Sequence, residues 1–472
     1  MARKIDKALL ADVAVLAAIA GFLLTYFSPE YLLSANMTTG GDTASHYYTA
    51  LYMKAYLLPR GRLSGWMPGN FAGYPILQFY FPLPFLVMSA LSCFIPMQIA
   101  FKIVTVLGIF LLPLCTYGAL RLLRYAFPVP VLGALFTLPF LFNEANSMWG
   151  GNIMSTLAGE FAYSIGFALS ILFIGSVYRG ITTGRHAVKN AVLIALIGLA
   201  HGYALLYSGV ISLCFLFAND FPGKLKYLLR VHLLGFMLMG IWIFPLLWYM
   251  PETTHLSAIW EINSLSEVFP PVLVPFVVLA LAGRTAGFAV FVRDAAVGTS
   301  LQALFSKMDK RMLYLWSCVM IGGFLFLASY ALHITDIRFL PYLQALLPVI
   351  AGIEAGLLCR RIKLYWLTPI ILFLAVVLWL DGKEQNLHSW IQWNYTGFEN
   401  KRDWPVLSDI SAYLKGAVSD PRVAYEHSPL NKTFGSERAF ESLPLFSGRS
   451  TLEGLYMEST ASSPFVYYLQ SE

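Results

Sequence analysis

The residues best suited to chemistry lie in a short polar stretch that follows the first long apolar segment. Gly40 and Gly41 precede Asp42, and His46 comes one helical turn later. Two glycines let the backbone approach a ligand closely, and a carboxylate beside apolar walls at a bilayer surface is costly unless it is paired or solvated. Asp42 is therefore either the N-cap of a helix that begins at Thr43 or a general base directed into a cleft. His46 would share its helix face, as a ligand contact or as a hydrogen-bonded surface residue.

Further polar residues lie at the ends of other apolar segments. Glu160 falls about one turn inside an apolar segment, soon after Asn152, and an acid at membrane depth is a functional candidate by default. His201 separates two short apolar segments, an arrangement in which broken helices often line a cavity. Glu261, beside Trp260, is one more acid in a connecting segment, where a single acid is usually just solvated.

The composition places these residues in an all-α polytopic membrane protein. Of its 472 residues, 58% are hydrophobic and 12% charged, and the mean hydropathy is +0.65. Repeated apolar runs of about 20 residues indicate membrane-spanning helices, and no barrel-like alternation is present. The five cysteines lie in or beside apolar segments, which argues against a disulfide framework. The eleven predicted spans are 9–27, 99–120, 125–142, 157–178, 190–200, 203–217, 232–250, 268–282, 312–332, 340–358 and 364–380.

Clusters of Lys and Arg orient these spans. All six clusters lie on one side if the short, proline-bracketed segment 82–96 does not cross, so we predict that it is a re-entrant or interfacial helix. The positive-inside rule makes that side, with the N-terminus, cytoplasmic. The net charge of +6 is then an orientation signal, and we expect no nucleic-acid partner. The clusters begin at Arg3, Arg121, Arg179, Lys224, Lys307 and Arg360.

The opposite, extracytoplasmic side would carry the first loop, 28–98, and a tail, 381–472, beyond a transmembrane domain, 1–380. Turn signals in the tail predict a small α/β region, and its aromatic residues form either a carbohydrate-binding surface or an interfacial belt. Arg338 stands out on this side because basic residues are scarce there, and a guanidinium suits a phosphate. The alternative is a salt bridge from Arg338 to Asp336 or to another acid. The aromatic residues are Trp390, Trp393, Tyr395, Phe398 and Trp404.

Several function classes lack their motifs. The sequence has no P-loop and no GxGxxG after a strand, so nucleotide chemistry is unsupported. The eight histidines have no HxH or HExxH spacing, which argues against a zinc hydrolase. A transporter or flippase remains the alternative to an enzyme, and Glu354, inside the tenth predicted span, is the residue that favours it.

Four stretches stand out by their glycine, polar or aromatic residues: 40–43, 149–161, 336–339 and 447–456. They resemble a bacterial membrane-protein family labelled 6-pyruvoyl-tetrahydropterin-synthase-related. The overall pattern resembles the GT-C superfamily of glycosyltransferases and, more distantly, the mycobacterial arabinofuranosyltransferases. Metal-dependent GT-C members carry paired acids of the Asp-x-Asp type, whereas this first loop has a lone Asp42, so a divalent cation (Mg²⁺ or Mn²⁺) is left open.

The resemblance implies a multi-pass enzyme of the bacterial plasma membrane. It would be an inverting glycosyltransferase that moves a sugar from a polyprenyl-phosphate donor to an extracytoplasmic glycan or lipid acceptor. Asp42 would be the general base, and Arg338, helped by Lys102, would hold the leaving phosphate. The remaining side chains expected to bind substrate are His46, Asn152, Glu160, His201 and Glu261.

Overall fold

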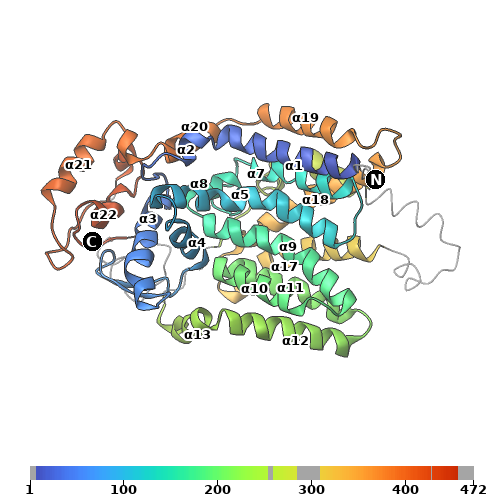
Figure 1. Cartoon of the computed structure of the whole chain (residues 1–472), viewed down its shortest axis with the longest axis horizontal. Coiled ribbons are helices and arrows are strands. Elements are labelled where there is room, and N and C mark those ends of the chain that lie inside the picture. The colour runs from blue at the N-terminus through green and yellow to red at the C-terminus, as the bar shows by residue number, and fades with distance from the viewer. Residues whose placement is uncertain (1–6, 254–258, 284–308, 427, 455–472) are drawn as a thin grey trace, which may run out of the picture.

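Long apolar helices make up most of the computed structural model, which describes residues 7–253, 259–283, 309–426 and 428–454. Five of them are long and apolar enough to cross a bilayer, and they lie side by side in one bundle (Figure 1). A sixth candidate is a bent pair, α12 (Phe221–Leu238) and α13 (Gly240–Tyr249), with an angle of 84° at the break. The five helices are α1 (Lys7–Tyr26), α5 (Met97–Leu122), α9 (Phe161–Thr183), α17 (Lys310–Leu332) and α18 (Leu340–Cys359), which η5 (Asp336–Phe339) precedes directly.

The other five predicted spans coincide with shorter apolar helices of 10 to 17 residues. Helices of this length are shorter than the hydrocarbon core requires of a straight crossing. A total of eleven spans therefore stays a prediction. The shorter helices are α6 (Val129–Leu135) with α7 (Leu138–Leu141), α10 (Ala187–Ala200), α11 (Gly202–Leu213) with η3 (Cys214–Phe217), Val274–Gly283, and α19 (Thr368–Asp381).

Close packing of α5 against α9 holds the centre of the bundle. A Cβ on Gly108 would lie 2.5 Å from the Ser164 carbonyl carbon, and one on Gly175 would lie 2.3 Å from the Ala119 oxygen. Small residues allow helix backbones to approach this closely in membranes, where lipid tails compete with apolar side chains. This contact fixes the beginning of α9, where Glu160 lies.

One end of the bundle is covered by short elements from the first loop and the tail, together with the short helix that precedes α9 (Figure 1). The segment predicted not to cross forms α4, which has nine residues. A two-stranded antiparallel sheet pairs Gly65 with Ile76. The short elements are α2 (Pro29–Leu32), α3 (Thr43–Tyr52), η1 (Met53–Leu57), η2 (Leu58–Arg60), β1 (Gly65–Met67), β2 (Tyr74–Ile76), α4 (Leu83–Leu91), α8 (Ile153–Ala158), α20 (Leu387–Tyr395), α21 (Trp404–Tyr413) and α22 (Leu443–Phe446). Short 3₁₀ segments complete the described chain: η4 (Met250–Glu252), η6 (Phe398–Asn400), η7 (Pro429–Phe434) and η8 (Ala439–Ser442), with α14 (Leu265–Val268) between α13 and α17.

The basic clusters that the structure describes gather at the opposite end, where α1 begins (Figure 1). Arg124, Arg179 and Arg311 line one hollow of about 320 Å³, and the Lys7 ammonium lies 5.8 Å from the ring centre of Trp366. Arg3 and Lys307 lie outside the described residues. The grouping of the described clusters at one end is as predicted, whereas the orientation of the chain across a membrane stays a prediction.

The described part of the tail differs from the predicted α/β region. It consists of short helices and one isolated parallel bridge between Val423 and Thr451. Its extended segment instead finds partners in the first loop, because Thr451 N donates to Gly69 O at 2.7 Å and Phe71 N donates to Glu453 O at 3.3 Å. The tail and the first loop therefore form one layer over the end of the bundle.

Candidate active site

Asp42 directly precedes α3, but its side chain makes no capping hydrogen bond to that helix. The carboxylate is 16% exposed, and its Oδ1 lies 3.1 Å from Nη1 of Arg438, which comes from the tail. The simple N-cap role is therefore not observed. Asp42 instead joins the first loop to the tail at the covered end of the bundle.

The two glycines before Asp42 allow the first loop to pack on α8. Gly40 and Gly41 have φ values of 86° and 49°, and a Cβ on Gly41 would lie 2.3 Å from the Ala158 oxygen. That oxygen accepts a hydrogen bond of 2.9 Å from the Asp42 backbone N–H. The close approach that glycine permits is thus made to the end of a helix, and it fixes where the Asp42 carboxylate can reach.

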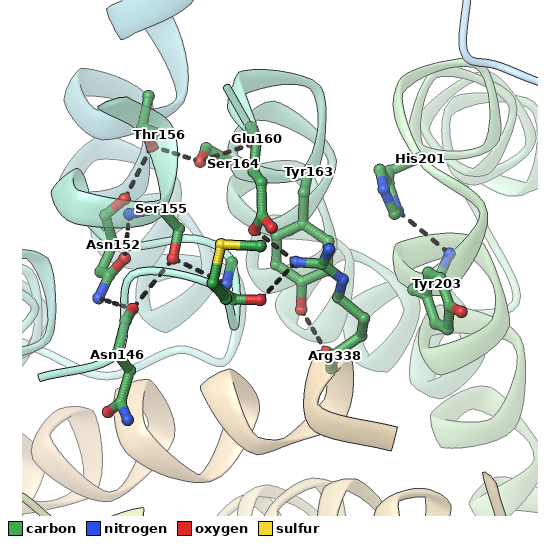
Figure 2. Close-up of polar contacts among 12 residues, drawn as sticks. Asn146, Asn152, Ser155, Thr156, Glu160, Tyr163, Ser164, His201, Tyr203 and Arg338 are labelled. Carbon is green, nitrogen blue, oxygen red and sulfur yellow. Dashed lines mark hydrogen bonds and ion pairs between the residues drawn. The ribbon is translucent and has the colours of Figure 1, made fainter. Parts of the chain in front are cut away.

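Glu160 lies in the turn between α8 and α9, and its carboxylate pairs with the Arg338 guanidinium from η5 (Figure 2). Nη1 of Arg338 also donates to the Met148 oxygen at 2.9 Å, and the Tyr163 hydroxyl donates to the Arg338 oxygen at 2.5 Å. Asp336 does not pair with Arg338, because its carboxylate accepts from the N–H groups of Trp260 and Ile337. Two roles were predicted for Arg338, and the structure shows the salt bridge to another acid. The Arg338 side chain is 16% exposed.

These two ion pairs lie within electrostatic reach of each other. Burial raises the pKa of Asp42, while the Arg438 and Arg338 guanidinium groups oppose that rise. A Cβ on Gly159 would lie 2.8 Å from the Asp42 Cβ, which places the residue before Glu160 against Asp42. The structure thus brings together three residues that sequence alone had only placed on a common side: Asp42, Glu160 and Arg338.

The two predicted histidines are both enclosed by aromatic rings. His46 is 1% exposed, its ring centre lies 5.1 Å from those of Tyr80 and Phe161, and burial lowers its pKa to about 3. It is therefore neutral at physiological pH. His201 caps α11 by accepting from Tyr203 N at 3.3 Å. Figure 2 shows its ring together with Glu160 and Arg338.

Three other predicted site residues have separate surroundings. Lys102 is fully buried, and its ammonium donates to the backbone oxygens of Tyr31, Ser34 and Tyr395, each at 3.0 Å. It ties the first loop to α20 and has its donors occupied. Asn152 caps α8, accepting from Ser155 N and donating to the Asn146 backbone oxygen (Figure 2). It also donates to the Asn143 backbone oxygen. Glu261 is exposed.

Sequence reasoning missed a buried group in the tail. Arg438 Nη1 lies 3.7 Å from Glu441 Oε1, and Glu441 Oε2 accepts a 2.5 Å hydrogen bond from the Ser45 hydroxyl of α3. The Glu441 side chain has no exposed surface, and burial raises its pKa to about 8. The spacing of Arg438 and Glu441 suggests a local pair, but nothing in the sequence links that pair to Asp42, far away in the chain.

The carboxylates of Asp42 and Glu160 do not fit a bound divalent cation. Mg²⁺ and Mn²⁺ need several oxygen ligands, whereas arginines engage both Asp42 and Glu160. Within the described ranges, no three His, Cys, Asp or Glu side chains are placed to share an ion. We therefore derive no step through a metal.

A match to a family model, which covers most of the predicted transmembrane domain, assigns the chain to a family. The family model described as "6-pyruvoyl-tetrahydropterin synthase related domain; membrane protein" matches residues 77–395, more than half of the chain. The chain belongs to this family of membrane proteins. Residues 408–472, which include Arg438 and Glu441, match a domain of unknown function. The comparison of the chain with curated proteins found no match.

The fold of this family member is similar to that of an oligosaccharyltransferase from Archaeoglobus fulgidus. The crystal structure of that enzyme in the apo form aligns with a TM-score of 0.55 at 12% identity, over 94% of this chain and 65% of that one. A structure of the same enzyme tethered with an acceptor peptide gives 0.47, at 12% identity over 94% and 64%. The chain thus spans slightly less than two thirds of that enzyme. The first match confirms the predicted GT-C-like fold.

Proposed function

We propose that this protein is an inverting glycosyltransferase that moves a sugar from a polyprenyl-phosphate donor to an extracytoplasmic glycan or lipid acceptor. The observation that carries the proposal is the position of Asp42. Its carboxylate makes no capping contact with α3 and lies 3.1 Å from the Arg438 guanidinium, within electrostatic reach of Arg338, at the covered end of a GT-C-like bundle. A solvent-exposed or helix-capping aspartate would need neither guanidinium.

Asp42 is the proposed general base. The acceptor hydroxyl gives its proton to the carboxylate while its oxygen bonds to the anomeric carbon, and the bond from that carbon to the phosphate oxygen breaks with its electron pair on the phosphate. Burial raises the pKa of Asp42 from its ordinary value, and the Arg438 and Arg338 guanidinium groups oppose that rise. A base whose pKa is raised in this way accepts a proton more readily than an exposed aspartate.

Arg338 is the proposed phosphate ligand, held in place by Glu160. Its contacts with Glu160 and with the Met148 oxygen both use Nη1. The donors on Nη2 and Nε suit a bidentate contact with the phosphate of the donor, and charge that develops there would be stabilised. His201 is retained as a sugar contact, whereas Lys102, whose donors are occupied, has no role in this proposal.

The localisation is part of the proposal. The basic clusters at the other end of the bundle would be cytoplasmic by the positive-inside rule. The first loop and residues 381–472 would then lie outside a bacterial plasma membrane, beyond the membrane domain formed by residues 1–380. A lipid-linked donor suits that side because it needs no soluble nucleotide sugar.

The test compares Asp42→Asn with Asp409→Asn in lipid nanodiscs. Asp409 is an exposed aspartate of α21. With a set of polyprenyl-phosphate sugars as donors, Asp42→Asn should lose transfer by about 10²–10⁴-fold while it still binds donor, and Asp409→Asn should match the wild type. Transfer at the wild-type rate by Asp42→Asn would contradict the assignment. Sugar flux that needs Glu354 and an ion gradient, without transfer, would favour a transporter instead.

A further inference from the structure

A groove beside Asp42 is lined by one face of α20, the first loop and the tail. Trp390 and Trp393 lie about one turn apart on α20 and line a cavity of about 540 Å³, together with Gly40 and Arg438. This volume is within the range of about 300–1,000 Å³ that is typical of small-molecule sites. A second hollow of about 620 Å³ shares Trp393 with the first, so the two adjoin along the helix.

The fold separates the aromatic residues of the tail into two groups. Tyr395 and Phe398 are each 1% exposed and belong to the hydrophobic core, and Trp404 packs against Phe446 with a ring-centre distance of 5.5 Å. Trp390 and Trp393 instead line the cavity. An interfacial belt does not explain these two residues, because both face a hollow shared with the tail and the first loop.

The groove matches the chemistry of a saccharide, which has apolar C–H faces and a rim of hydroxyl groups. The Trp393 ring is held in place, because its Nε1 donates to the Gly435 oxygen at 2.9 Å and the Lys401 ammonium lies 4.4 Å from its centre. A pre-positioned aromatic platform loses little conformational entropy on binding. Around it, Gln392 and Lys432 supply polar groups that suit hydroxyl contacts.

The groove leads to the candidate base. Arg438 lines it and lies 3.1 Å from the Asp42 carboxylate, and the backbone of Gly40 and Gly41, directly before Asp42, lines it as well. We propose that this groove binds the acceptor, and that the acceptor is an oligosaccharide whose reacting end lies on the Arg438 side. This inference rests on the proposed glycosyltransferase function, and it selects a glycan over a lipid as the acceptor class.

The test measures saccharide binding separately from transfer. Full-length Asp42→Asn in nanodiscs is immobilised and given oligosaccharides released by mild acid from the envelope of the cells that make the protein, and the retained species are identified by mass spectrometry. Adding Trp393→Ala should lower retention about tenfold or more, and Lys432→Ala should lower it less. Trp393→Phe, which keeps a ring, should retain most of the binding. Lys415→Ala, an exposed tail lysine away from the groove, should change nothing.

The outcomes separate this inference from the proposed function. No retained saccharide, or equal retention with Trp393→Ala, would overturn the groove assignment. Transfer by the active enzyme with an unchanged acceptor KM after both Trp393→Ala and Lys432→Ala would also overturn it while the transferase function stood. Saccharide retention that depends on Trp393, in a protein that transfers no sugar, would support the saccharide-binding role of the groove and contradict the proposed glycosyltransferase function.

Discussion

Replacing Glu441 with glutamine should remove a pH-dependent loss of stability. The Glu441 side chain has no exposed surface, accepts a hydrogen bond from Ser45 and lies 3.7 Å from Arg438. Glutamine has nearly the same shape as the protonated acid and offers an acceptor to Ser45, so Glu441→Gln should preserve the packing. It removes only the ability to ionise.

The expected size follows from the pKa. Burial raises the pKa of Glu441 from 4.5 to about 8, so between these values the folded protein holds a proton that the unfolded chain has released. The free energy of unfolding therefore falls as the pH rises through this window, by up to about 5 kcal/mol at about 1.4 kcal/mol per pH unit. Below it both states are protonated and nothing is lost. Above this window the loss is complete. The Arg438 guanidinium opposes the rise in the pKa of Glu441, and this effect is already contained in the value of about 8.

Thermal unfolding in nanodiscs at about pH 5 and about pH 8 measures this difference. The wild type should lose stability between the two conditions, and Glu441→Gln should lose clearly less. Glu437→Gln, at an exposed neighbouring position, is the matched control and should follow the wild type. Parallel behaviour of Glu441→Gln and the wild type across this range would show that Glu441 does not titrate there and would refute the reasoning.

Three further changes probe the ion pairs and the buried lysine. Arg438→Ala should raise the pKa of Asp42, because it removes a guanidinium at 3.1 Å, and the acidic limb of the pH profile of kcat/KM should move to higher pH; an unmoved limb would separate Arg438 from the base. Glu160→Gln should lower stability by about 3–5 kcal/mol, because it leaves Arg338 without its buried partner; thermal unfolding would show this, and a wild-type midpoint would contradict it. Lys102→Met should leave three carbonyl oxygens, one buried and two partly buried, without this donor, at up to about 1–3 kcal/mol each, and limited proteolysis should then cut the first loop faster than in the wild type.

Sequence predicted the membrane helices well, because their signal is local. Apolar runs located α5 and α9, and the segment predicted not to cross forms α4, whose nine residues are too few for a straight crossing. Sequence was less useful for the tail, where turn signals suggested an α/β region. The extended segment around Thr451 bonds to Gly69 in the first loop, and no local pattern reports a partner so distant in the chain.

The candidate site was predictable in composition but not in its pairing. Asp42, Glu160 and Arg338 were identified individually because each is unusual in its local setting. Which acid pairs with which arginine depends on how α8, η5 and the tail pack, and that is a tertiary property. Arg438 escaped notice because an arginine in a polar tail is unremarkable until the fold places it on Asp42.

The reliance of Asp42 on the tail has a consequence for biosynthesis. Ser45 and Glu441, which share a hydrogen bond beside Asp42, lie 396 residues apart in the chain. During translation the first loop is synthesised early. Nearly every helix of the bundle is synthesised after it and before Arg438. A nascent chain thus carries its carboxylate without the tail guanidinium, and the order of synthesis itself delays completion of the site until the bundle has been assembled.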